Sequence, residues 1–437
     1  MPANGLQDEV VSLARELIRL DTSNPPGNET PAAELLASYL RDAGAECELI
    51  GPDPERLNLV ARVAGGEGPS LLLLGHTDVV PAPTEGWSVG PFDGALRDGH
   101  VVGRGAADMK GELAARAAAL AACARSGERP AGDVVLIAES DEERCTADVG
   151  MSWLARERPD LRCDFAINEG GGSLLELADG RRVVTISIGE KQVTSLRIRV
   201  HGRAGHASVP EGADNAVANA ANAVTRLQAC EAPTRLIPAI ARALEGLGAP
   251  SGNEDEVVAW ACGQHPILSG LIPAMTRMTV TPTGLQTFEP SNVIPPYADV
   301  VCDCRALPGE TEADVRAHVA RALGDGLSYE IELLEPMAGG TESPIDTPLY
   351  RLCEEYVAGR LPGAQMLPLV SPGFTDSHWI RDAHGTVAYG FAPVFATDPI
   401  VYSDGMHSAD ECLAVADLVE MTEFNLYAIR ALSRPGV

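Results

Sequence analysis

The sequence of 437 residues is too long for one ordinary hydrophobic core and long enough for two domains. Its composition, 45% hydrophobic and 22% charged, is that of a globular protein, and its formal net charge of −29 argues against nucleic acid and anionic membranes as partners. No apolar run approaches the roughly 18 residues of a membrane span, and the N-terminal segment lacks the basic region that would indicate a signal peptide. The ten cysteines form no C-x-x-C pair. We therefore expect a cytoplasmic protein with free thiols.

The first 189 residues alternate between helical and strand patterns. Short apolar runs predict buried strands at 46–50, 58–63, 70–75, 134–138 and 164–168. Helical spacing of apolar residues predicts helices at 8–20, 30–44, 110–125 and 148–157. Strands that alternate with helices indicate an α/β fold with a largely parallel sheet and helices on both faces.

The pattern changes after Gly189. Half-exposed strands, recognised by alternating apolar and polar residues, are predicted at 192–203, 276–281, 297–305 and 328–335. With helices at 213–227 and 311–323 they form a smaller α+β layer with one open sheet face, whereas 232–273 is predicted to be a helical insertion. The chain then returns to the first domain and ends in a helix at 413–431. The predicted organisation is one discontinuous domain, 1–189 and 340–437, with a second domain, 190–339, inserted in it.

The chemistry-bearing residues begin at the end of the apolar run 71–74. After Gly75 the sequence reads His76-Thr77-Asp78, so His76 lies at the carboxyl end of a buried strand, where open α/β sheets bind ligands. Asp78 can reach the imidazole and fix its tautomer. The following Gly- and Pro-rich loop closes on GRGAADMKG, which presents Asp108 at the start of a helix. An imidazole and a carboxylate at one sheet edge indicate a metal site.

Further candidate ligands follow the later strands. The full set of strand-end or loop residues that could bind metal is His76, Asp108, Glu143, Glu169 and His407. Nitrogen and oxygen ligands suit Zn²⁺, Co²⁺ or Mn²⁺. Five ligands exceed the three of a single catalytic zinc, so we expect two ions with Asp108 as the bridging carboxylate. In a turn, one residue of the Glu142-Glu143 pair can hold metal while the other acts as general base.

Each of these residues also has an ordinary interpretation. A Glu-Glu pair is usually solvated surface, and a lone histidine after a strand is usually a capped loop residue. What supports the metal site is the order of the motifs: H-x-D after one strand, G-R-G-x-x-D-M-K-G, D-E-E after a second strand, and Glu169 after a third.

This set of motifs resembles the M20 family of metallopeptidases and amidohydrolases, which includes aminoacylases, deacetylases, desuccinylases and carboxypeptidases. The resemblance covers nearly the whole chain and implies a zinc-hydrolase catalytic domain with an inserted ferredoxin-like lid and dimerisation domain. It also implies that His76 binds one metal, that Asp108 bridges both, that Glu142 is the base and that Glu143 binds the second metal. Glu169 and His407 complete the two sites, and the Asp108–Met109 peptide bond is expected to be cis.

The resemblance extends to the second domain. The segment GRAGHASVP contains His206, which the resemblance assigns to the active site of a partner subunit, where it polarises the scissile carbonyl. Asn292 and Arg305 resemble a pair that contacts substrate, although Asn292 could simply cap a turn and Arg305 could be a surface strand residue. Gly373 and Thr375 belong to a loop that resembles one lining the substrate pocket.

The sequence departs from the family pattern beside the predicted pocket. Glu112 follows Gly111 where relatives usually have a second glycine, and Arg144-Cys145-Thr146 replaces the glycines after D-E-E. The terminal motif is G-M-H-S-A-D-E. These changes leave the identity of the substrate open.

The resulting hypothesis is a cytoplasmic, homodimeric metallohydrolase that cleaves an amide bond of an N-acyl amino acid or short peptide. In this hypothesis, water that bridges the two metal ions, with Zn²⁺ as the first choice, loses its proton to Glu142 and attacks the carbonyl. The dimer forms through residues 190–339, and the partner is a small-molecule substrate rather than nucleic acid or membrane. Two alternatives stay open: a di- or carboxypeptidase of the same family, and a metal-dependent binding protein that has lost catalysis, against which the presence of Glu142 argues.

Overall fold

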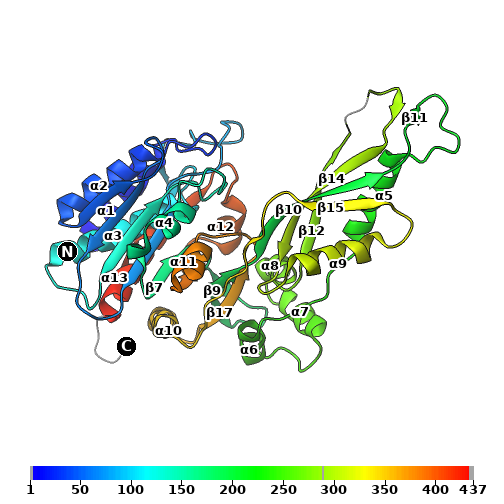
Figure 1. Cartoon of the computed structure of the whole chain (residues 1–437). Coiled ribbons are helices and arrows are strands. Elements are labelled where there is room, and N and C mark those ends of the chain that lie inside the picture. Colours follow the sequence, from blue (N-terminus) through cyan, green and yellow to red (C-terminus); the bar gives the residue numbers. More distant parts are fainter. Residues whose placement is uncertain (1–2, 288–289, 433–437) are drawn as a thin grey trace.

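The computed structural model describes residues 3–287 and 290–432. Within these ranges the chain forms a nine-stranded sheet and a five-stranded sheet, which lie side by side with their helices in Figure 1. In the same ranges, no helix is both long enough and apolar enough to cross a membrane.

The larger sheet has the strand order β1-β2-β6-β3-β7-β18-β9-β17, and β8 pairs with β9. Its strands are β1 (Glu46–Ile50), β2 (Asn58–Val63), β3 (Leu71–His76), β6 (Val134–Glu139), β7 (Phe165–Asn168), β8 (Leu174–Glu176), β9 (Arg182–Glu190), β17 (Gln365–Ser371) and β18 (Val387–Gly390). The central strands β6, β3, β7 and β18 are parallel to one another, whereas β1 and β2 at one edge are antiparallel. Every residue of β3 and β6 is buried, as expected for central strands covered on both faces.

Helices cover both faces of this sheet, as predicted. Leu71 and Leu73 of β3 face the core shared with helices α1, α3 and α13, whereas Leu72 and Leu74 face the core shared with α4 and α11. The helices that surround the sheet are α1 (Ala3–Ile18), α2 (Thr30–Ala43), α3 (Lys110–Ser126), α4 (Met151–Glu157), α10 (Pro348–Arg360), α11 (Ser377–His384), α12 (Pro399–Gly405) and α13 (Val415–Ala431), with a short 3-10 turn at Pro159–Leu161.

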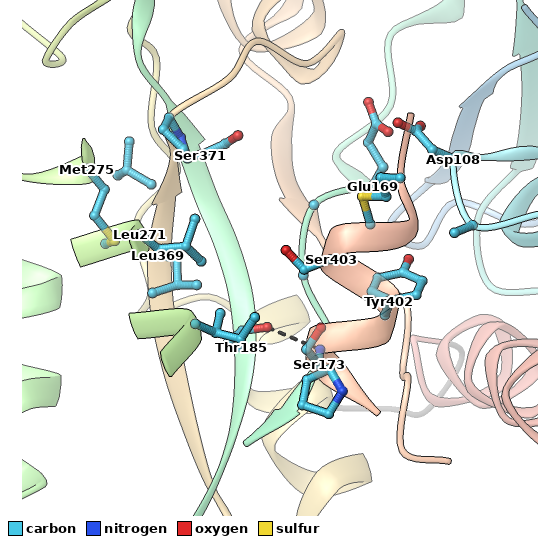
Figure 2. Close-up of a pocket in the computed structure, with 18 of the residues that line it drawn as sticks. Asp108, Glu169, Ser173, Thr185, Leu271, Met275, Leu369, Ser371, Tyr402 and Ser403 are labelled. Atoms are coloured by element: carbon cyan, nitrogen blue, oxygen red, sulfur yellow. Dashed lines mark hydrogen bonds between the residues drawn. The ribbon is translucent and has the colours of Figure 1, made fainter. Parts of the chain in front are cut away.

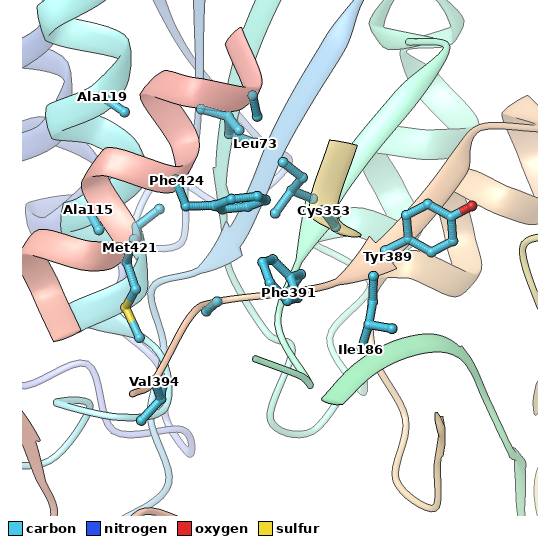
Figure 3. Close-up of a cluster of buried hydrophobic side chains, with 14 of the residues drawn as sticks. Leu73, Ala115, Ala119, Ile186, Cys353, Tyr389, Phe391, Val394, Met421 and Phe424 are labelled. Atoms are coloured by element: carbon cyan, nitrogen blue, oxygen red, sulfur yellow. The ribbon is translucent and has the colours of Figure 1, made fainter. Parts of the chain in front are cut away.

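The larger core combines small and aromatic side chains, as Figure 3 shows. Ala115 and Ala119 of α3 lie beside α13, where their small size lets the two helices approach closely. From α13, Phe424 contacts Phe391 edge-on, with ring centroids 4.7 Å apart. This packing fixes the chain after β18 against the helix that closes the fold.

The smaller sheet has the order β12-β14-β10-β15 and is antiparallel throughout. Its elements are β10 (Gln192–His201), α5 (Ala216–Ala229), β12 (Thr279–Gln286), β14 (Tyr297–Ala306), α9 (Glu312–Leu323), β15 (Tyr329–Leu333) and β16 (Ala338–Gly339), the last of which pairs with β10. Both helices pack on one face of this sheet, and the β-α-β-β-α-β order with this strand arrangement is ferredoxin-like. The other face carries the half-exposed residues of the alternating pattern.

Only Lys191 separates β9 of the larger sheet from β10 of the smaller one. Three helices that lie between α5 and β12 in the chain nevertheless share the core of the larger sheet: α6 (Pro238–Gly246), α7 (Glu254–Cys262) and α8 (Pro266–Met275). Smaller pairings are formed by β11 (Gly205–His206) with β13 (Val293–Ile294), and by β4 (Ala95–Arg97), β5 (His100–Val102) and β19 (Cys412–Ala414). The segment predicted as a helical insertion is therefore helical, and it packs onto the larger sheet.

Candidate active site

The candidate active site lies at the carboxyl ends of three neighbouring parallel strands. His76 is the last residue of β3, Glu169 follows β7, and Glu142 and Glu143 lie in a turn after β6. Because β6, β3 and β7 are adjacent and parallel, these side chains meet at one edge of the sheet. Asp108 comes from the loop before α3.

The first group of possible ligand atoms surrounds the buried imidazole of His76. Its Nε2 lies 3.1 Å from Asp108 Oδ1 and 3.6 Å from Glu169 Oε2. The three ligand atoms lie within 4.8 Å of one another, a spacing that could hold a metal ion. The Asp108–Met109 peptide bond is cis, as the resemblance implied.

The second group uses the other oxygen of the same aspartate. His407 Nε2 lies 3.1 Å from Asp108 Oδ2 and 3.3 Å from Glu143 Oε2, and these three residues also satisfy the spacing of a metal site. The His407 side chain is 52% exposed, whereas that of His76 is 1% exposed, so the second group is the one open to solvent. The structure thus brings all five predicted ligands together, with Asp108 shared by both groups.

The charge of the site suits cations. Contacts with the carboxylates of Asp108 and Glu143 raise the pKa of His407 to about 10, and burial raises the pKa of Glu169 to about 7. Crowded carboxylates and imidazoles of this kind are the donors that divalent ions such as Zn²⁺ accept, and a bound ion would neutralise the excess negative charge. The residues present therefore fit two divalent metal ions.

Asp78 connects the first group to the Glu142-Glu143 turn. Its backbone carbonyl oxygen lies 2.9 Å from His76 Nδ1, while its carboxylate Oδ1 is 3.4 Å from the same nitrogen. The closer partner that fixes the imidazole tautomer is thus the carbonyl rather than the predicted carboxylate. The carboxylate instead accepts hydrogen bonds from the backbone N–H groups of Glu142 and Glu143, each at 3.2 Å.

Glu142 is held beside the ligands without belonging to either metal-binding group. Removal from water and the nearby carboxylate of Glu169 raise the pKa of Glu142 well above its ordinary value. A carboxyl group with a raised pKa next to a metal site has the properties of a general acid–base.

Sequence reasoning missed Glu411, which holds the loop that carries Asp108. The buried Glu411 carboxylate accepts hydrogen bonds from Arg104 Nη1 at 2.5 Å and from the backbone N–H groups of Gly105, Ala107 and Asp108 at 3.2, 2.8 and 3.0 Å. Glu411 is the last residue of the G-M-H-S-A-D-E motif. The sequence shows this glutamate but gives no sign that it pairs with the distant Arg104.

The structure places His206 and Asn292 away from the metal ligands of the same chain. His206 lies on β11, which Figure 1 shows at the far end of the smaller sheet from β7. Its imidazole is exposed and Nδ1 lies 2.7 Å from Ser208 Oγ. The exposed Asn292 adjoins the same end, where its carbonyl accepts a hydrogen bond from Ala207 N at 3.0 Å.

Arg305 lies near the opposite end of β14 from Asn292, so the structure does not bring these two predicted residues together within one chain. The Arg305 guanidinium donates to the Asp303 carboxylate from Nε at 2.9 Å and from Nη2 at 3.0 Å. Gly373 and Thr375 follow β17; Gly373 N donates to Ser371 Oγ at 3.2 Å, and Thr375 is buried.

A cavity of about 200 Å³ opens beside the first group of ligands. Figure 2 shows Asp108 and Glu169 at one end of it and Ser173 and Thr185 at the other, between β9 and β17 on one side and α12 on the other. A substrate group attached to an amide at the ligands could therefore extend into the protein.

Comparison with known proteins agrees with this geometry. The model of peptidase family M20/M25/M40 matches residues 72–431. The chain belongs to this family. A succinyl-diaminopimelate desuccinylase of Rhodospirillum centenum is 29% identical over 424 residues, which cover 94% of each protein.

Solved structures of M20 proteins share the fold. An M20 family metallo-carboxypeptidase from Sulfolobus solfataricus superposes with a TM-score of 0.72 at 18% identity, covering 98% of this chain and 99% of that one. A dinuclear metal binding peptidase of the M20 family from Bacillus subtilis gives a TM-score of 0.63 at 15% identity, with coverage of 98% and 99%. The protein is thus an M20 hydrolase with an α/β catalytic fold.

Proposed function

We propose that this M20 enzyme hydrolyses the amide bond of an N-acyl amino acid or short peptide, using two divalent metal ions. The observation that carries the proposal is Asp108, whose two oxygens take part in two separate groups of possible ligands, with Glu142 beside them. The ten cysteines are free in the structure, which supports a reducing, cytoplasmic setting as part of the proposal.

His76, Asp108 and Glu169 would hold one ion, and Asp108, Glu143 and His407 the other, with Zn²⁺ proposed first and Co²⁺ or Mn²⁺ as substitutes. When bound, such ions polarise a carbonyl oxygen and lower the pKa of water.

Glu142 is proposed as the general base and acid. It accepts a proton from the attacking water and later returns it to the leaving amine, so that its own protonation state is restored at the end of the cycle. Asp78 supports this role because its carboxylate holds the backbone of Glu142 and Glu143 while its carbonyl holds the His76 ring. A base fixed relative to the ligands needs little reorganisation during the reaction.

His206 is proposed to act in the active site of a partner subunit, where its imidazole would stabilise the carbonyl oxygen as charge develops. This proposal requires a homodimer formed through the domain of residues 190–339. The position of β11 at the far end of the smaller sheet and the exposure of His206 support it, as does the open face of that sheet. Asn292 would reach the partner's site in the same way. Arg305, Gly373 and Thr375 would contact the substrate bound in their own subunit.

The first experiment separates the base from the ligands. Glu142→Ala should lower turnover by about 10²–10⁴ while metal content, measured by elemental analysis of the purified protein, stays unchanged. The neighbouring Glu143→Ala is the matched control and should lose one ion. Loss of metal from Glu142→Ala, or retention of full activity, would contradict the assigned roles.

A substrate panel then distinguishes a deacylase from a peptidase. The Zn²⁺-reconstituted enzyme should be offered N-acetyl amino acids and unmodified dipeptides. Each pair should carry the same residue on the carboxyl side of the scissile amide. We expect hydrolysis of the N-acyl amino acids. Cleavage restricted to dipeptides would identify a peptidase instead.

A further inference from the structure

The wall of the cavity beside Asp108 and Glu169 is mostly apolar. Figure 2 shows Leu271, Met275 and Leu369 along one side of it. Among the described residues that line this cavity, none is a lysine, arginine or histidine. A negatively charged group that entered it would find no opposite charge.

Several polar groups of the cavity wall already have partners within the protein. Thr185 Oγ1 accepts a hydrogen bond from Ser173 N at 3.1 Å, shown as a dashed line in Figure 2. The Tyr402 hydroxyl donates to the buried Glu112 carboxylate at 3.1 Å, and Glu112 in turn pairs with Arg116 at 2.9 Å. These groups therefore offer a bound molecule little that would compensate for the loss of its own hydration.

The apolar side belongs to α8, one of the helices that pack onto the larger sheet. Ile267, Leu271 and Met275 are four residues apart and share one helical face, which lines the cavity. Both ends of α8 are anchored: His265 Nδ1 accepts a hydrogen bond from Ile267 N at 3.1 Å, and Lys191 Nζ donates to the Ala274 carbonyl at 2.9 Å. The wall is thus held in place before any substrate arrives.

We propose that this cavity binds an uncharged, apolar chain of the substrate, attached to one side of the scissile amide. The inference rests on the proposed amide hydrolysis and adds a substrate class to it. It also separates this protein from relatives named for a succinylated substrate, since a succinyl group ends in a carboxylate. Such a carboxylate would lose its hydration in the cavity without gaining a cation.

The size of the cavity sets the length of the chain. At ~30 Å³ for a group the size of a water molecule, about 200 Å³ accommodates about six or seven methylene-sized groups. Each buried methylene should raise kcat/KM about fourfold. The gain should stop when the cavity is full.

The test is a set of kcat/KM values for the full-length, Zn²⁺-reconstituted protein. One series varies the acyl group on glycine through acetyl, butyryl, hexanoyl, decanoyl and succinyl. The other keeps the acetyl group and varies the amino acid through glycine, alanine and norleucine. A steep rise in the first series assigns the cavity to the acyl chain, and a steep rise in the second assigns it to the amino-acid side chain. If the acyl chain occupies the cavity, N-succinylglycine should be at least about tenfold poorer than N-butyrylglycine as a substrate.

Variants of α8 locate the effect. Leu271→Lys should lower the preference for the longer chain at least about tenfold. If the acyl chain occupies the cavity, it should also improve N-succinylglycine relative to N-butyrylglycine. The matched control is Ser269→Lys, which adds the same charge on the exposed side of the same helix and should leave both ratios unchanged. If Leu271→Lys fails to fold, Leu271→Phe should instead shorten the optimal chain.

A binding measurement keeps this inference separate from the proposed activity. Calorimetry on Glu142→Ala should show N-hexanoylglycine binding at least about tenfold more tightly than N-succinylglycine, or N-acetylnorleucine more tightly than N-acetylglycine if the side chain occupies the cavity. Flat series with amide hydrolysis intact would overturn the apolar cavity and leave the proposed function standing. Absence of hydrolysis with Zn²⁺, Co²⁺ and Mn²⁺, together with selective binding, would overturn the proposed function alone.

Discussion

Replacement of Glu411 by glutamine tests whether this residue holds the loop of Asp108. The wild-type carboxylate accepts four hydrogen bonds, from the Arg104 guanidinium and from three backbone N–H groups of the loop. In Glu411→Gln the side chain keeps its size, but one acceptor oxygen becomes an NH₂ group that faces N–H donors. The buried Arg104 also loses its counter-ion.

The expected loss of stability follows from these contacts. Removal of one partner from a buried ion pair costs about 3–5 kcal/mol because an uncompensated charge is left behind. With an unfolding entropy of ~2.1 cal/mol/K per residue over 437 residues, this corresponds to a fall in Tm of about 3–5 °C. A displaced Asp108 loop should also weaken metal binding by about 10–100-fold, as is typical when a group that orients a ligand is removed.

The assays are thermal unfolding of the metal-free protein and titration with Zn²⁺ against a competing chelator. The control is Glu332→Gln, which removes the partner of Arg197 in an exposed ion pair of the smaller sheet and should cost no more than about 1 kcal/mol. If Glu411→Gln unfolds at the wild-type temperature and binds Zn²⁺ with wild-type affinity, Glu411 does not hold the loop.

Three further predictions concern metal, assembly and the junction of the two sheets. Exhaustive chelation should abolish hydrolysis, and Zn²⁺, Co²⁺ or Mn²⁺ should restore it; activity that persists in protein shown to be metal-free would exclude the metal mechanism. Mixing His206→Ala with Glu142→Ala under conditions of subunit exchange should restore up to about a quarter of wild-type activity, since about half of the dimers are mixed and each holds one intact site. No recovery, despite exchange seen by mass spectrometry, would place His206 outside the partner's site. Burial lowers the pKa of Lys191 from 10.5 to about 8, so between these pH values the unfolded chain binds more protons and native stability rises with pH. In urea unfolding, the stability of wild type over Lys191→Met should therefore grow by up to about 3 kcal/mol across this window, and a constant difference would contradict the assignment.

The sequence by itself determined the elements whose pattern is local. The apolar run before His76 predicted a buried strand at 70–75, and the structure has β3 at Leu71–His76. Strand ends also predicted the neighbourhood of Glu143 and Glu169, because parallel strands bring their carboxyl ends to one sheet edge. The assignment of Asp108 as the shared residue followed from its position between the His76 strand and the Glu142-Glu143 strand and from the family resemblance. Its two oxygens do take part in the two groups.

Only the tertiary structure decided which distant segments meet. Strands β9, β17 and β18 were not predicted individually. β9 is buried along nearly its whole length, so it lacks the alternation of a half-exposed strand, and its partner β17 lies about 180 residues later in the chain. Glu411 was overlooked for the same reason: its partner Arg104 is 307 residues away in the chain. The helical insertion was predicted, but not that Ile267, Leu271 and Met275 line a cavity. Leu268 and Ile272 form a second apolar face of α8, and the sequence alone cannot say which neighbour covers each face. Periodicity fixes which side of an element is buried, whereas packing of the whole chain fixes what it is buried against.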